Sequence, residues 1–326
     1  MNGEIKMSTE EKTEPNNGKE EKRDKKAPSV GGSAAAAVSC GLAGVLLVLR
    51  CYQLLKITDF DTGFFTDSKS ATVLPMYVSF VLFVVLTMLT VKLARLTLRK
   101  EPASERDIIH GAASVLMCAG FVCAGIDGFV SFFENVSDSG MTQLVYLKAN
   151  KAYSEVLSPL LAFFSAGAVL TDAAAAFTGR SAAKKLRMLH LCPALWLFSL
   201  TVGYFGITAN YLKEPQFMLL IFATVFFMLF MFEYARFVCG VAAESSEKLF
   251  VSSGAVSVGL FAAVLIPELL AGIFAEGYSG VVNADFAWWQ AAAPVFALSA
   301  LRMRFGCDAA PCEHSGAELS EDGEKI

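Results

Sequence analysis

The sequence has few charged residues. Only 18% of its 326 residues are Asp, Glu, Lys or Arg, whereas 55% are hydrophobic. A water-soluble protein of this size carries nearer a quarter charged residues, because its surface must be solvated. This composition excludes a soluble enzyme, a nucleic-acid binder and a disulfide scaffold.

The familiar signatures of catalysis and cofactor binding are also absent. The chain has no phosphate-binding Gly-x-x-x-x-Gly-Lys-Ser/Thr, no Gly-x-Gly-x-x-Gly, no His-Glu-x-x-His and no Cys-x-x-Cys. Its three histidines, His110, His190 and His314, are too few and too scattered for a histidine-rich metal centre. We therefore expect no catalytic residue, no metal site and no cofactor, although the sequence leaves an enzymatic activity open.

Long apolar segments dominate what is present. A helix crosses about 30 Å of hydrocarbon with roughly 20 residues at about 1.5 Å per residue. Such runs predict helices rather than a β-barrel, whose strands would alternate apolar and polar residues. The last segment is the weakest, since it is short and contains Gln290 and Pro294, but Trp288 and Trp289 at its start are typical of an interfacial anchor. The eight predicted spans cover residues 34–55, 72–94, 109–132, 155–177, 186–208, 216–238, 250–274 and 286–303.

The lysines and arginines predict the orientation of these spans. Of the 27 basic residues, 21 lie on one side of the eight spans, five lie on the other, and Arg50 lies inside the first span. Positive charge is retained on the cytoplasmic side. We therefore expect both termini in the cytoplasm of a multi-pass cell-membrane protein, whose general partner is the lipid bilayer.

Three regions follow from this arrangement. Residues 1–33 mix basic and acidic residues with Asn, Gly, Ser and Pro, so we expect a disordered cytoplasmic tail. Residues 34–304 form the helical bundle, and residues 305–326 form a short acidic tail. Cys307, Cys312 and His314 in that tail have a spacing that zinc could use, but three ligands make a weak signal, and a reduced, metal-free tail is the preferred interpretation.

Charged residues inside the spans are the candidate functional residues. An ionised side chain at the centre of a membrane helix costs about 2.5–3.5 kcal/mol, so its presence indicates a pathway, a pair or a site. Arg50, Asp127 and Glu268 each fall about two-thirds of the way to the external surface, on three helices that run outward. We expect them to form a binding site. Asp172, Glu233 and Arg236 are the secondary candidates near the inner boundary, the last two as an interfacial ion pair.

Local sequence supports two of these candidates. Asp127 falls on one helical line with Gly120, beside Cys123 and Ala124, and such a small-residue stripe lets a neighbouring helix approach closely. Glu268 follows Pro267, which frees a backbone carbonyl one turn earlier. A helix break beside a carboxylate is how transporters build cation or proton sites. A purely structural salt bridge from Arg50 to one acid is the alternative.

An internal repeat is a further hypothesis. Arg95 precedes Asp127 by the same 32 residues that separate Arg236 from Glu268. Spans one to four and five to eight would then form two parallel halves, a known transporter plan. Against this, a basic residue at the cytoplasmic end of a span is commonplace.

Two functions remain open from the sequence. The first is a transporter-like protein that binds or translocates a small solute or a cation through Asp127, Glu268 and Arg50. The second is a non-catalytic membrane sensor or scaffold that acts on a partner protein through its cytoplasmic loops and tails.

Overall fold

The protein is helical wherever its structure is described. The computed structural model describes residues 32–56, 73–94, 106–150, 152–179, 185–206, 215–241, 244–274 and 287–305, and these contain no strand. Most of the two predicted tails therefore lies outside the described residues. The helices are α1 (Gly32–Lys56), α2 (Val73–Leu93), α3 (Ile108–Ser139), α4 (Gln143–Asn150), α5 (Tyr153–Thr178), η1 (Leu189–Leu191), α6 (Cys192–Gly206), α7 (Pro215–Val238), α8 (Glu244–Phe274) and α9 (Trp288–Phe305).

Six of these helices are long and apolar enough to cross a membrane: α1, α2, α3, α5, α7 and α8. This confirms the all-helical fold with several candidate membrane-spanning helices, as predicted for a polytopic membrane protein. The other two predicted spans are also helical, as α6 and α9, but α6 is shorter and α9 is less apolar. Helix α3 continues to Ser139, two turns beyond its predicted end, and packs there against the short helix α4.

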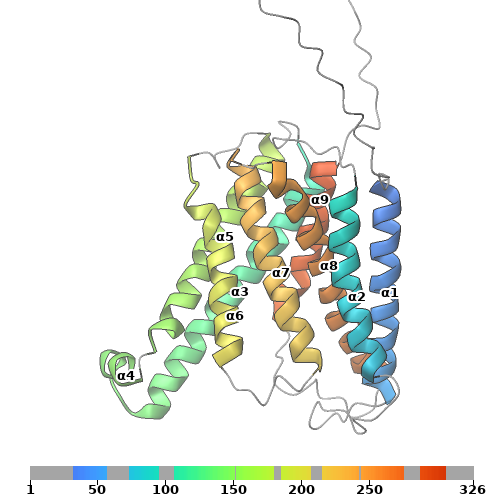
Figure 1. Cartoon of the computed structure of the whole chain (residues 1–326). Coiled ribbons are helices and arrows are strands. Elements are labelled where there is room, and N and C mark those ends of the chain that lie inside the picture. The colour runs from blue at the N-terminus through green and yellow to red at the C-terminus, as the bar shows by residue number, and fades with distance from the viewer. Residues whose placement is uncertain are drawn as a thin grey trace, which may run out of the picture.

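The helices form one bundle with α8 at its centre (Figure 1). α8 packs against α1, α2, α7 and α9, and most of it is buried. α3 lies along α5 and α9, while α1 and α2 pack on each other and on α8 at one flank. The wide apolar faces left exposed on α1 and α2 are those expected of helices that face lipid.

One end of the bundle gathers the basic side chains, and we call it the basic end. There Lys248 Nζ at the start of α8 donates to the Lys92 carbonyl at the end of α2, at 2.6 Å. Arg302 near the end of α9 lies 3.8 Å from Asp107, which caps α3 by accepting the His110 backbone N–H. α1 begins and α9 ends at this same end (Figure 1).

The two halves of the predicted repeat pack differently. α7 lies along α8, whereas no comparable contact joins α2 to α3 in the described parts of the chain. α8 packs along both helices of the first pair, whereas in the described residues α3 meets α6 and α7 only through single side chains, such as His110 with Tyr234. These contacts lend no support to a twofold relation between the halves.

Close helix packing is clearest where α3 meets α9. A Cβ at Gly120 would lie only 2.7 Å from the Trp289 Cα, so glycine is required there. Trp289 is buried, and its ring packs edge-on against Trp196 and Phe261. Only Trp288 is exposed as an interfacial anchor should be, so the prediction for Trp289 was wrong. Because Trp289 packs against α3 at Gly120, its ring fills the core of the bundle and does not reach the membrane interface.

Candidate functional site: two buried polar clusters

A polar cluster joins α1, α7 and α8 near the end of the bundle opposite the basic end. Arg50 Nη2 donates to Gln216 Oε1 at 2.6 Å, and Arg50 Nη1 donates to Gln53 Oε1 at 3.2 Å. Gln216 Nε2 in turn donates to Glu268 Oε1 at 2.8 Å and to the Val264 carbonyl at 2.9 Å. We call Arg50, Gln53, Gln216 and Glu268 the arginine cluster.

Burial makes these contacts strong. Arg50 is 1% exposed and Gln216 is 2% exposed, while Glu268 is half-buried. A guanidinium held away from water needs hydrogen-bond acceptors for its N–H groups, because it stays charged under all ordinary conditions. Gln216 supplies one acceptor to Arg50 and uses its amide group to hold Glu268. The predicted meeting of Arg50 and Glu268 is therefore present, with Gln216 as the bridge that sequence reasoning missed.

Pro267 lies inside α8, which continues without interruption to Phe274. Pro267 cannot donate to the Ala263 carbonyl one turn earlier, and the next carbonyl, of Val264, accepts the hydrogen bond from Gln216. The start of α7 is thereby tied both to the backbone and to the carboxylate of α8. The proline, a carbonyl of the preceding turn and the carboxylate expected from the sequence lie together, but α8 is not broken between them.

Asp127 does not join this cluster. Its side chain is exposed on α3, a helix that packs mainly on α5 and α9 and not on α1. The expectation that Asp127 faces a neighbouring helix was wrong. The small-residue stripe of α3 does admit a close neighbour, but at Gly120 and not at Asp127. Gly120 already meets the start of α9 at Trp289. Asp127 lies seven residues, or about 10 Å, further along α3 than Gly120. At that level α9 has not yet begun, so α9 does not cover the Asp127 side chain.

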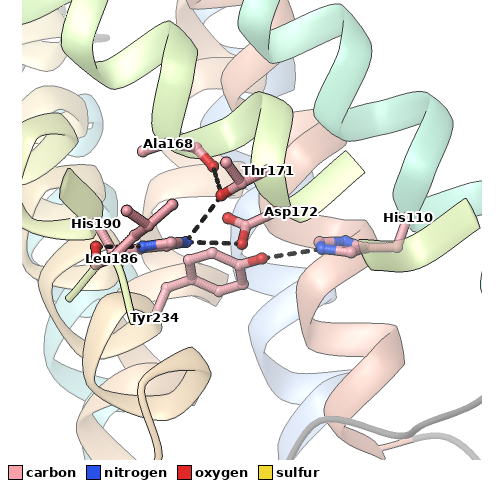
Figure 2. A network of polar contacts seen from close by, with 7 residues as sticks. All are labelled: His110, Ala168, Thr171, Asp172, Leu186, His190 and Tyr234. Atoms are coloured by element: carbon pink, nitrogen blue, oxygen red, sulfur yellow. Dashed lines mark hydrogen bonds and ion pairs between the residues drawn. The ribbon is translucent and has the colours of Figure 1, made fainter. Parts of the chain in front are cut away.

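A second polar cluster lies close to the basic end (Figure 2). His190 Nε2 lies 2.9 Å from Asp172 Oδ1, and His190 Nδ1 lies 3.1 Å from the Leu186 carbonyl. On the other side, His110 Nε2 lies 3.0 Å from the Tyr234 hydroxyl. His110 Nδ1 lies 3.1 Å from Ser299 Oγ. We call His110, Asp172, His190, Tyr234 and Ser299 the histidine cluster.

All five members are at least nine-tenths buried, and they come from α3, α5, η1, α7 and α9. Sequence reasoning found Asp172 but dismissed His110 and His190 as scattered, because they are 80 residues apart. Packing of α3 and η1 against α5 brings them to one place. The signal that could have found them is the rarity of histidine in the spans, since an ionisable residue at membrane depth indicates a site.

The predicted pair of Glu233 and Arg236 is present. Arg236 Nη1 lies 3.0 Å from Glu233 Oε1, and the Ser246 hydroxyl also donates to this carboxylate. Beside it, the buried Arg304 guanidinium lies 3.4 Å from Glu247 and 4.5 Å from the centroid of the Phe237 ring. These contacts anchor the ends of α7 and α9 and the start of α8 at the basic end.

The chemistry available is proton and ion binding. Carboxylate, imidazole and phenol groups exchange protons, and a carboxylate beside a freed carbonyl can bind a cation. In the part of the chain that the structure describes, no three His, Cys, Asp or Glu side chains are grouped to hold a metal ion.

The arginine cluster predicts an order of stabilities. Arg50→Ala should destabilise the protein by about 3–5 kcal/mol, because it leaves Gln216 and Glu268 buried without their cation. Glu268→Gln should cost less than about 1.5 kcal/mol, since an amide can still accept from Gln216. Asp127→Asn, at an exposed position, is the control and should change stability by about 0.5 kcal/mol or less. Unfolding in mixed micelles measures all three, and equal stability of Arg50→Ala and Asp127→Asn would contradict the contacts described.

Comparisons with protein-family models, with curated protein sequences and with solved structures found no match to this chain. The function must therefore be inferred from the two buried clusters and from the bundle that holds them.

Proposed function

We propose that the protein spans the cell membrane eight times and keeps its basic end in the cytoplasm. Support comes from helices at all eight predicted positions, of which six are long and apolar enough by themselves. The exposed basic side chains Lys92, Lys185, Lys248 and Arg302 lie toward the basic end, as the positive-inside rule requires. The internal repeat is not part of this proposal, because the two halves pack differently.

Within the membrane the protein acts as a transporter-like protein that binds or translocates a small solute or a cation. The observation that carries this proposal is the arginine cluster. Charged residues at membrane depth mark pathways and binding sites more often than they serve stability. Here an arginine, an amide and a carboxylate from three helices meet beside Pro267, a proline inside α8.

The half-buried Glu268 is the group that meets the transported species. Arg50 is enclosed and holds Gln216, so its role is to position the amide. The Glu268 carboxylate retains access from its less buried side and can accept a proton or a cation. Because α1, α7 and α8 all contribute members of the cluster, a movement of these helices against one another would change the site. Alternating access in transporters works through such relative movements.

Topology can be tested by labelling engineered cysteines in a background with the eight native cysteines replaced. Met141→Cys, in the exposed turn before α4, should react with a membrane-impermeant maleimide on intact cells. Lys185→Cys, exposed before η1, should react only after permeabilisation. The two positions serve as controls for each other, and labelling of both from outside would refute the eight-span arrangement.

Transport can be tested by solid-supported-membrane currents from proteoliposomes, screened over cations, amino acids and organic acids. We expect the wild-type protein to give a current with at least one class, and Glu268→Gln to reduce it at least tenfold without loss of folded protein. Asp127→Asn is the matched control and should keep the current. A folded, inserted protein without current over the whole panel, or full current in Glu268→Gln, would overturn this function in favour of a sensor or scaffold.

A further inference from the structure

Hydrogen-bond donors and acceptors in the histidine cluster determine where its protons lie. His190 Nδ1 faces the Leu186 carbonyl, which can only accept, so this nitrogen carries a hydrogen. Nε2 of the same ring faces Asp172 Oδ1 at 2.9 Å. An imidazole and a carboxylate that are both unprotonated on these atoms would repel each other. One proton must therefore lie between His190 and Asp172, and the pair is neutral as a whole.

The tautomer of His110 follows in the same way. Ser299 Oγ donates its hydrogen to the Phe296 carbonyl at 2.7 Å, so towards His110 it can only accept. His110 Nδ1, 3.1 Å away, therefore carries a hydrogen. In the neutral ring Nε2 is then an acceptor, and the Tyr234 hydroxyl at 3.0 Å donates to it.

Tyr234 connects the two histidines. Besides its contact with His110, its hydroxyl acts electrostatically on the Asp172 carboxylate, beside which it lies in Figure 2. A phenol has one hydrogen and can donate to one of them at a time. Donation to His110 matches a neutral His110. Donation to Asp172 leaves the phenol oxygen as an acceptor for a protonated His110.

We propose that His110, Tyr234, Asp172 and His190 form a proton-binding site that takes up one further proton on His110 Nε2. On uptake, an O–H bond of a hydronium ion breaks and an N–H bond forms at Nε2, while the Tyr234 O–H turns from His110 to Asp172 with its own bond intact. The cluster gains one positive charge. The proton comes from water at the basic end, where the partly exposed Asp107 lies one turn from His110.

Burial opposes this uptake, and the acids around the site offset part of its cost. The cost of placing a charge on the buried His110 ring is the larger effect, which Asp172 on α5 and Asp107 on α3 counteract electrostatically. Just after α7, the Cys239 thiol interacts electrostatically with Asp172 and with the exposed Arg187, which lies before η1. From α9, Arg302 lies 3.8 Å from Asp107, which partly neutralises it.

In a transporter-like protein, the bound proton would serve as the coupling ion. That role of the site rests on the proposed function. The binding of the proton itself depends only on the geometry of the cluster. Nuclear magnetic resonance of the imidazole nitrogens tests it without any transport. The chain has three histidines, so ¹⁵N-histidine labelling of the full chain in lipid nanodiscs gives three sets of signals, assigned by replacing each histidine with glutamine.

We expect three results from a titration between about pH 8 and pH 5. His190 should have both nitrogens protonated throughout, while His110 should begin with hydrogen on Nδ1 alone and gain one on Nε2. Tyr234→Phe should move the His110 midpoint by about one pH unit to lower pH. Both forms of the ring lose a hydrogen bond, but the bond from the protonated ring is charge-assisted and therefore the stronger of the two. Tyr204→Phe, which removes a hydroxyl from α6 outside the cluster, should leave the midpoint unchanged.

Two outcomes would overturn the proton site: a His110 that stays neutral over the whole range, or a Tyr234→Phe variant with the wild-type midpoint. Because these signals do not depend on transport, the proton site and the transport function fail separately. Protonation of His110 in a protein without any current would leave the site standing and refute only the transport function.

Discussion

A buried guanidinium must find acceptors, and the bundle depends on this at Arg50. α1 and α2 expose wide apolar faces and are held to the rest of the protein through α8. Van der Waals contacts between apolar helices give little preference for one depth or rotation over another in lipid. The hydrogen bond of Arg50 to Gln216 on α7 does give such a preference, because a slip of α1 would take the buried charge away from this acceptor. The arginine cluster therefore sets the register of α1.

α7 contributes to both polar clusters. Gln216 lies at its beginning and Tyr234 near its end, 18 residues or about 27 Å apart along the helix. A helix is stiff over this distance, so a shift of α7 that alters the hydrogen bonds of Gln216 would also be felt by Tyr234. Such an element is a physical means by which proton binding at the basic end could bias the site at Glu268.

Prediction from the sequence succeeded for the helices because the signal for a membrane span is one of length and apolarity. The positions of the eight helices, the pair of Glu233 and Arg236, and the meeting of Arg50 with Glu268 all follow from spacing and depth along the chain. Gln216 was missed because an uncharged amide at the start of a span is not costly enough to stand out. The prediction for Asp127 was wrong because the sequence shows which face of α3 carries small residues but not where its partner α9 begins. The histidine cluster needs the tertiary packing of α5 with α3 and η1, and of α7 with η1 and α9, which no local pattern reveals.

The central claim is that Arg50 and Glu268 act on one another through Gln216. A double-mutant cycle with Arg50→Gln and Glu268→Gln, measured as free energies of unfolding in mixed micelles, tests this directly. We predict a coupling energy of about 1–3 kcal/mol in the wild-type background, and a clearly smaller value when the cycle is repeated with Gln216→Ala. A coupling energy of zero in the wild-type background, with all variants folded, would contradict the account.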